Sequence, residues 1–338
     1  MNWLLLALAF ALAFIPTAYY MPHFIGLLRT RKELLRPDMN KAGKPLVPAL
    51  GGIALVTGFM FSLASVVLIS VLFSANSVNL AVLLPAMLTL ALIALLGLVD
   101  DIIVIPKRFT KPILTLYASI PMMALAGLNT VIYLPLFGGI DFGILYGLVF
   151  VPLAIVFCAN AVNILSTYNG IEAGMGLVAA FGIFLAAYIK GEFTGMLIAV
   201  PFIAVLIVFL RYNMLPAKIF PGNVGALFIG GALAVAAILG NVERTLVIIM
   251  IPYFAHFLLY SRNLFRWKPE MWGVPQKNGT LKCGYNRPYG IMHWLIMNRQ
   301  GMTEKKVVYS LIALEALFAA AAVMAELTRL RIPEVFAL

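Results

Sequence analysis

LAVLLPAMLTLALIALLGLV, residues Leu80 to Val99, contains no charged side chain and leads directly into Asp100 and Asp101. A helix needs about 20 predominantly apolar residues to cross the hydrocarbon core of a bilayer, so this stretch is long enough to span a membrane. An ionised carboxylate inside a membrane helix costs roughly 3 kcal/mol, and a like-charged neighbour adds repulsion. The pair therefore indicates a metal, a cationic partner or a proton path at a membrane surface.

The composition of the whole chain agrees with a membrane protein. Of the 338 residues, 63% are hydrophobic and only 11% are charged, which excludes an ordinary soluble domain. The net charge of +11 is expected to face anionic membrane lipids rather than nucleic acid. The two cysteines, Cys158 and Cys283, are too few for a disulfide framework and lack metal-site spacing.

Apolar stretches of spanning length recur along the chain and predict an all-α polytopic membrane protein. We expect one integral-membrane domain over residues 1–338, with both termini on the same side of the membrane. Met1 to Tyr20 has no basic leader and is predicted to be a retained helix rather than a cleaved signal peptide. The ten predicted transmembrane helices cover approximately residues 3–28, 48–73, 79–99, 112–128, 144–162, 173–190, 194–211, 224–240, 244–261 and 307–327.

Positive charge is distributed unequally between the two predicted faces. Twenty of the 24 Lys and Arg residues fall in the loops after spans one, three, five, seven and nine. The positive-inside rule makes this face cytoplasmic, places Asp100 and Asp101 on it, and sends both termini outside. On the outer face, Val131 to Phe142 predicts a short hairpin that turns at Gly138-Gly139. The loop from Arg262 to Lys306 contains aromatic, Gly and Pro residues and is predicted to be one structured cytoplasmic loop.

Asparagines form a second polar cluster on the predicted cytoplasmic face, in the stretch NAVNILSTYNGIE from Asn160 to Glu172. Asn160 and Asn163 are three residues apart and share one helix face. Asn169-Gly170 is a turn signal, so we expect the helix to break there. Amide carbonyl oxygens can bind a hard cation, but asparagines also join helices by hydrogen bonds, and both interpretations stay open.

Two further clusters lie on the same face. Phe220-Pro-Gly-Asn223-Val-Gly225 precedes span eight, where glycines permit close backbone approach, although Asn223 could simply cap a helix. Lys44 precedes a Gly51-Gly52 pair at the start of span two, and Lys111 follows the aspartates. Basic residues beside glycines suit a phosphate, while ordinary positive-inside flanking explains any single lysine equally well.

These three motifs, Gly97-Leu-Val-Asp100-Asp101, the stretch from Asn160 to Gly174 and Phe220-Pro-Gly-Asn223, resemble the polyprenyl-phosphate N-acetylhexosamine-1-phosphate transferases in order and spacing. The resemblance covers nearly the whole chain. It is closest to the eukaryotic and archaeal branch, because the last loop has only His293 and Val104 stands where bacterial members have a third acid.

The resemblance implies a reaction. Members of this branch transfer GlcNAc-1-phosphate from UDP-GlcNAc to dolichyl phosphate, giving GlcNAc-PP-dolichol and UMP, with Mg²⁺ as cofactor and Mn²⁺ as a possible substitute. This reaction is the first step of lipid-linked oligosaccharide assembly for N-glycosylation. The expected location is an archaeal plasma membrane or the endoplasmic reticulum. Direct attack by the lipid phosphate and an aspartyl intermediate both remain open.

The resemblance also implies roles for residues. The metal ligands would be Asn163 and Asn223, although the family has aspartate at the second position, and this loss of charge should weaken the metal site. Phe220 is expected to stack on uracil. The catalytic residues are predicted to be Asp100, Asp101 and Lys111. The remaining predicted substrate-binding residues are Lys44, Asn160, Asn169, Gly170, Glu172, Arg262, Arg266 and Arg287.

Two other classes of protein fit parts of the pattern. A Mg-dependent prenyltransferase also uses aspartates at a membrane face, but it would need a second acidic motif, and no other adjacent acidic pair exists here. A membrane transporter would be expected to have charged or broken helices near the middle of the bilayer. Gly170 and Gly174 form a GxxxG pattern that suits either a homodimer or packing within one bundle.

Overall fold

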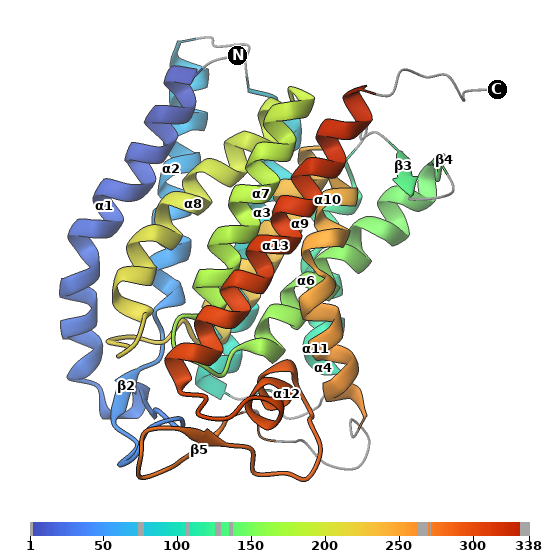
Figure 1. Ribbon diagram of the computed structural model, residues 1–338. Coiled ribbons are helices and arrows are strands. Elements are labelled where there is room, and N and C mark those ends of the chain that lie inside the picture. Colours follow the sequence, from blue (N-terminus) through green and yellow to red (C-terminus); the bar gives the residue numbers. More distant parts are fainter. Residues whose placement is uncertain are drawn as a thin grey trace.

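The computed structural model describes residues 3–73, 78–103, 105, 109–125, 130–134, 138–262, 270 and 272–331. Helices dominate these residues and run roughly side by side (Figure 1). They are α1 Trp3–Arg29, α2 Gly52–Leu72, α3 Leu80–Ile103, α4 Thr110–Ala118, α5 Ile120–Met123, α6 Val151–Leu165, α7 Ile171–Lys190, α8 Phe193–Asn213, α9 Gly222–Leu239, α10 Glu243–Ile249, α11 Ile251–Ser261, α12 Ile291–Asn298 and α13 Glu304–Arg331. Three short antiparallel pairs complete the fold: β1 Leu35–Pro37 with β2 Leu46–Pro48, β3 Val131–Leu134 with β4 Gly138–Asp141, and β5 Val274–Pro275 with β6 Leu281–Lys282.

The helices confirm an all-α polytopic membrane protein but do not confirm ten spans. Within the described residues, eight helices are long and apolar enough to cross a membrane. The pair α10 and α11, bent by 51° at Met250, makes a ninth span if it is counted as one. The predicted fourth span, 112–128, is divided at Ser119 into the short helices α4 and α5. Neither of these two reaches spanning length by itself.

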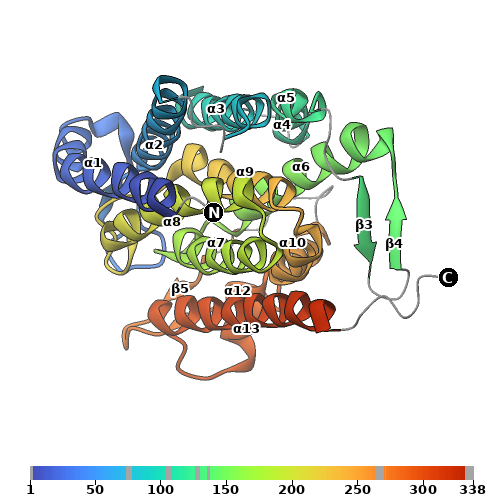
Figure 2. The same ribbon diagram turned by 90° about the horizontal axis from the view of Figure 1, so that it is seen from above.

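Helix α9 lies at the centre of the bundle. In its apolar stretch 89% of the residues are buried, against 33% in α1 and in α13. Figure 2 shows α7, α8 and α9 between a layer formed by α1 to α5 and the single helix α13. The helix can occupy this crowded position because its residues are small: a Cβ on Gly230 would lie 2.1 Å from the carbonyl oxygen of Cys158 in α6.

The two ends of the bundle differ in what they present. Helix α1 begins and α13 ends at one end, where the β3–β4 hairpin also lies, and β2, β5 and α12 lie at the other end (Figure 1). The hairpin is present, but the predicted turn at Gly138-Gly139 is wrong. Both glycines pair within strand β4, opposite Leu134 and Tyr133, so the turn comes before them in the chain.

Two other local predictions can be compared with the structure. The predicted helix break is confirmed, because α6 ends at Leu165 and α7 begins at Ile171 after Gly170, which has a φ of +83°. In the GxxxG pattern, a Cβ on Gly174 would lie 2.4 Å from the side chain of Ile312 in α13. This glycine therefore serves packing within one chain, and the homodimer stays a prediction.

Candidate active site

A polar cavity of about 580 Å³ lies at the end of the bundle where α3 ends and α9 begins. Its walls come from segments far apart in the sequence: the first loop after α1, the end of α3, the α6–α7 loop, the start of α9 and Trp272 of the last loop. Five of the predicted site residues line it, namely Asp101, Asn169, Glu172, Phe220 and Asn223. The structure therefore brings three of the sequence clusters to one place.

Asp101 is held at the N-terminus of α9. Its Oδ1 accepts hydrogen bonds of 2.9 Å from the backbone and side-chain nitrogens of Asn223, and its Oδ2 accepts one of 3.0 Å from the backbone nitrogen of Val224. The first backbone N–H groups of a helix have no partner within the helix, and the helix dipole favours negative charge there. Gly222, with a φ of +69°, permits this approach, since a Cβ would lie 2.6 Å from Asp101 Oδ2.

A chain of polar side chains joins three helices beside the cavity. Asn163 of α6 donates from Nδ2 to Asn223 Oδ1 at 2.8 Å, and Asn223 of α9 donates from Nδ2 to Asp101 of α3. Asn223 is the second residue of α9, and the helix begins without a side-chain cap, so its capping role is excluded. The residues that the resemblance assigns to a metal are thus in mutual contact.

The donor chemistry of this chain fits a hard divalent cation. Carboxylate and amide oxygens are the ligands that such cations prefer, and the N and O ends of an asparagine amide can exchange places by rotation. Within the described residues, no three His, Cys, Asp or Glu side chains gather to hold a metal. A cation at this place would therefore depend on Asp101 together with the amide oxygens of Asn163 and Asn223.

Asp100 has different partners from its neighbour. Consecutive residues of a helix point about 100° apart, so the two carboxylates diverge. Asp100 is 3% exposed, forms an ion pair with Lys111 of α4, and accepts a 2.8 Å hydrogen bond from the backbone nitrogen of Ile105. The predicted counter-charge of Lys111 is thus present for Asp100, whereas Asp101 is bound to the start of α9.

A second network lies beside the cavity and includes two of its lining residues, Asp38 and Asn169. Lys41 Nζ pairs with Asp38 and, at 3.0 Å, with Glu304 Oε2 at the start of α13. Asn169 donates from Nδ2 to Asp38 at 2.8 Å and from its backbone nitrogen to Glu304 at 3.2 Å. Asp38 and Glu304 lie far apart in the chain, so no local spacing could reveal their shared partner.

Asn40 joins the last loop, predicted over residues 262–306, to the loop between α6 and α7. Its Nδ2 donates to the carbonyl oxygen of Thr167 at 2.7 Å, and its Oδ1 accepts from the backbone nitrogen of Gly273 at 2.9 Å. The neighbouring Trp272 lines the cavity. Tyr168 also lines it, and burial raises the pKa of its phenol well above the ordinary value, so this group stays neutral.

Phe220 forms one wall of the cavity and is fixed by its backbone. Its N–H donates to the carbonyl oxygen of Pro48 at 2.7 Å, and its carbonyl oxygen accepts from Gly51 N at 2.8 Å. Gly52 N donates in the same way to Pro221 O at 2.8 Å. The two glycine amides, which the sequence suggested for a phosphate, are therefore already used in holding α2 against α9.

Among the buried oxygens beside the cavity, one each of Glu172 and Asn213 lacks a hydrogen-bond partner within the described residues. Glu172 accepts from the hydroxyl of Ser166 through Oε1, while its Oε2 is unpaired. Asn213 donates from Nδ2 to the carbonyl oxygen of Ile219 at 2.9 Å, and its Oδ1 is unpaired. Buried polar atoms are nearly always satisfied in folded proteins, so these acceptors are suited to a bound ligand or water.

The other predicted site residues do not line the cavity. Asn160 donates to the carbonyl oxygen of Val156 at 2.8 Å and to Thr115 Oγ1 at 3.4 Å, which joins α6 to α4. Lys44 is exposed on the first loop. A Cβ on Gly170 would lie 2.4 Å from the sulfur of Met214, so this glycine is required by packing.

The predicted arginines of the last loop are similarly placed. Arg287 donates to the hydroxyl of Tyr289 at 2.6 Å and lies 5.2 Å from the centre of that ring. Arg262 lines a separate apolar groove. Arg266 lies outside the described residues. Substrate contacts of these three residues stay predictions.

The fold and the site define a membrane-embedded protein with an enzyme-like polar cavity at one end of its spans. Comparison with known proteins gives the family: residues 83–241 match the family model of glycosyl transferase family 4. A provisionally named UDP-N-acetylglucosamine–dolichyl-phosphate N-acetylglucosaminephosphotransferase of Saccharolobus solfataricus is 35% identical over 303 residues, which is 88% of this chain and 90% of the relative. The chain therefore belongs to glycosyl transferase family 4, which confirms the resemblance drawn from the three motifs.

Two further relatives show the breadth of the match. The UDP-N-acetylglucosamine–dolichyl-phosphate N-acetylglucosaminephosphotransferase of Schizosaccharomyces pombe is 27% identical over 82% of this chain and 68% of the relative. The phospho-N-acetylmuramoyl-pentapeptide-transferase of Enterococcus faecalis is 31% identical over 80% of this chain and 89% of the relative. The chain is thus similar to members that are named for different sugars.

Proposed function

We propose that this protein transfers GlcNAc-1-phosphate from UDP-GlcNAc to dolichyl phosphate or a related polyprenyl phosphate, giving a GlcNAc-diphosphate lipid and UMP. The observation that carries the proposal is the 35% identity, over 88% of the chain, to a relative named for this reaction. The cavity supports it, because a water-soluble donor and a membrane lipid can meet only at the end of the membrane spans. The product would begin lipid-linked oligosaccharide assembly for N-glycosylation.

The orientation that follows places the cavity in the cytoplasm. The loops at this end of the bundle contain most of the Lys and Arg residues, and the positive-inside rule assigns such loops to the cytoplasmic face. Both termini would then lie outside. A nucleotide-activated sugar made in the cytoplasm would reach the cavity without crossing the membrane.

The nucleotide would occupy the cavity between Phe220 and the network around Asn169. The volume of about 580 Å³ lies within the usual range for small-molecule sites. Phe220 supplies an aromatic face on which a uracil ring can stack. Asn169 is held from two directions by Asp38 and Glu304, so its position is defined before the donor binds.

In the reaction, an oxygen of the lipid phosphate attacks the β-phosphorus of UDP-GlcNAc, and the bond from that phosphorus to the UMP oxygen breaks. The second pKa of a phosphate monoester is about 6, so the acceptor is mostly a dianion at neutral pH and needs no strong general base. We therefore assign Asp100 and Lys111 to positioning and charge: the buried carboxylate orients the ammonium group toward the phosphates. Asp101 orients the start of α9, and with it Asn223.

Mg²⁺, or Mn²⁺ in its place, would be held by Asp101, Asn163 and Asn223 and would supply positive charge to the diphosphate. Since Asn223 adds no formal charge, affinity for the cation should be lower than with an aspartate at this position. Without a cation, the hydrogen bonds from Asn163 through Asn223 to Asp101 keep the three helices aligned.

Membranes that contain the expressed protein test the proposal directly. We expect incubation with UDP-[³H]GlcNAc, dolichyl phosphate and Mg²⁺ to give labelled lipid in an organic extract, and the label to disappear when dolichyl phosphate is omitted. Absence of labelled lipid with every UDP-N-acetylhexosamine would overturn the proposal. Single-turnover release of UMP without acceptor would overturn direct attack.

A second candidate donor is UDP-N-acetylmuramoyl-pentapeptide. One observation supports it, the 31% identity to the phospho-N-acetylmuramoyl-pentapeptide-transferase of Enterococcus faecalis. The same assay with UDP-N-acetylmuramoyl-pentapeptide and undecaprenyl phosphate distinguishes the two. We expect the GlcNAc donor to be used, because the last loop has no histidine except His293. That side chain is buried, and desolvation lowers its pKa, so it contributes neither charge nor an exposed contact.

A further inference from the structure

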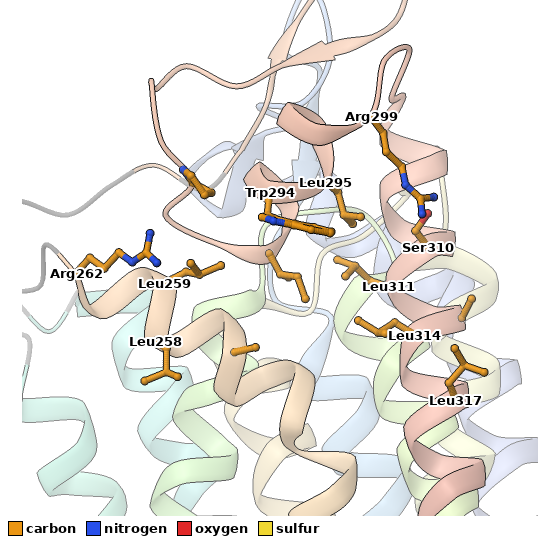
Figure 3. A pocket seen from close by; sticks show the side chains of 14 residues that line it. Leu258, Leu259, Arg262, Trp294, Leu295, Arg299, Ser310, Leu311, Leu314 and Leu317 are labelled. Carbon is orange, nitrogen blue, oxygen red and sulfur yellow. The ribbon is translucent and has the colours of Figure 1, made fainter.

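A second and larger hollow lies on another part of the molecule. It is a groove of about 830 Å³ between α11, α12 and α13, and Figure 3 shows its lining side chains. Its body is apolar, with Leu258, Leu259, Leu311, Leu314 and Leu317 among the lining residues. None of its lining residues also lines the polar cavity. The groove is therefore a separate site.

The chemistry of the groove changes along its length. The leucines of α11 and α13 form its lower part in Figure 3, while Arg262 and Arg299 lie on opposite sides of its upper part with Trp294 between them. The lining contains these two arginines and no acidic residue. Trp294 is 49% exposed, and tryptophan is enriched where the bilayer meets water. The groove thus combines an apolar length with a positively charged end.

An amphiphile with a single anionic head group matches this arrangement. Helix α13 has spanning length and the α10–α11 pair is a broken span, so the apolar part of the groove faces acyl chains in a bilayer. The arginines lie toward α12, at the end of the bundle where the basic loops gather. Arginine binds phosphate groups through several N–H donors, and each basic residue near a membrane surface strengthens binding of anionic lipid about fivefold. We propose that this groove binds one anionic phospholipid, with its head group at the end that carries Arg262 and Arg299 and an acyl chain along the leucines.

The occupant is distinct from the lipid acceptor of the proposed reaction. Asp100, Lys111 and the Asn163–Asn223 contact belong to α3, α4, α6 and α9. Figure 2 shows α3 and α4 on the opposite side of the α7–α9 layer from α13. A lipid in the groove between α11 and α13 would therefore not present its phosphate to that cluster. This proposal goes beyond the transferase function and does not depend on it.

Native mass spectrometry of the full-length protein tests the site. The delipidated protein is mixed with phosphatidylglycerol or with phosphatidylcholine of the same acyl chains, and bound lipids are counted. We expect one phosphatidylglycerol to be retained in preference to phosphatidylcholine. Arg299→Gln should reduce that preference about fivefold, and the double variant Arg262→Gln/Arg299→Gln should abolish it.

Two further variants keep the result decisive. Ala313 is exposed and lines the groove, so Ala313→Trp should fill it without disturbing the core and should lower retention of phosphatidylglycerol with both arginines intact. Arg211→Gln removes an exposed arginine at the end of α8 and should leave retention unchanged. Equal binding of the two lipids, unchanged retention in the Ala313→Trp variant, or displacement of phosphatidylglycerol by equimolar dolichyl phosphate would overturn the proposal.

Discussion

The polar cavity and the groove between α11 and α13 are built in opposite ways. The cavity collects residues from segments separated by most of the chain, and hydrogen bonds and ion pairs set its geometry. The groove is formed mainly by three elements that lie close together in the last third of the chain, and apolar residues, including six leucines, make up most of its lining. Substitutions that remove a single hydrogen-bonding atom should therefore impair the cavity. The groove should instead respond to substitutions that change side-chain volume or charge.

The largest effect is expected at Asp101. Asp101→Ala removes the acceptor of three hydrogen bonds and releases the start of α9, and a displacement of about 1 Å can lower the rate roughly a hundredfold. We expect labelled lipid in the transferase assay to fall by at least that factor. The control is Asp141→Asn in the β3–β4 hairpin, which removes an exposed carboxylate at the other end of the bundle. A loss below fivefold for Asp101→Ala would contradict the assignment.

The second-largest effect is expected from breaking the ion pair between Asp100 and Lys111. Lys111→Met leaves a buried carboxylate without its partner and should lower the free energy of unfolding by about 3 kcal/mol, somewhat less for partial exposure of the lysine. The double variant Asp100→Asn/Lys111→Met should recover much of the stability in thermal unfolding but not the transfer activity. Recovery of both would show that the pair serves only the fold.

Asn223→Asp tests the metal site with a readout other than activity. A second carboxylate beside Asp101 should destabilise the protein without cation, because the two charges repel, and should tighten binding of Mn²⁺ roughly tenfold. Electron paramagnetic resonance measures free Mn²⁺, and thermal unfolding with and without Mn²⁺ measures the stability change. Asn298→Asp, on the exposed end of α12, is the matched control. Unchanged Mn²⁺ affinity would show that the metal does not bind at this position.

A smaller effect is expected from the network around Lys41. Glu304→Gln keeps an acceptor for the backbone N–H of Asn169 but removes one of the two carboxylates that pair with Lys41. Partly exposed ion pairs contribute up to about 1 kcal/mol, so the KM for UDP-GlcNAc should rise about fivefold with kcat within twofold. Glu33→Gln changes an exposed residue on the same loop as Lys41 and should change neither the KM nor the kcat. An equal fall of kcat would instead indicate a role in the chemical step.

The smallest effect on catalysis is expected in the groove. Arg299 lies outside the cavity, so Arg299→Gln should leave transfer activity within twofold when dolichyl phosphate is supplied in detergent. Steady-state assays on the purified variant provide the measurement. A tenfold loss under these conditions would show that the two regions are coupled.

Much of this architecture can be predicted from the sequence, because each membrane-spanning helix requires a run of about 20 predominantly apolar residues. Runs such as Leu80 to Val99 predicted spans, and the turn signal at Asn169-Gly170 correctly predicted a break, which lies between α6 and α7. Short features were less readable: the hairpin turn was assigned to two glycines that pair within β4, and the fourth predicted span is divided at Ser119. In both places local composition permits more than one backbone path, and packing selects among them.

The site divides in the same way. The clusters around Asp101, Asn163 and Asn223 could be predicted as site residues from the sequence, because polar residues at the ends of apolar spans are energetically costly and therefore indicate function. The roles of Asp38, Lys41 and Glu304 could not be predicted, since a polar residue in a loop or at a helix start is ordinary and only the fold brings the three together.

By itself, the sequence determined the membrane class, most of the spans, the family and the end of the bundle at which the polar motifs gather. Apolar length, charge distribution and short motifs are local properties, and a linear chain displays them directly. Only the tertiary structure decided that Asp100 pairs with Lys111 while Asp101 holds the start of α9. It also decided that Arg262 lines an apolar groove, because the partner of each side chain depends on helix packing over long sequence distances.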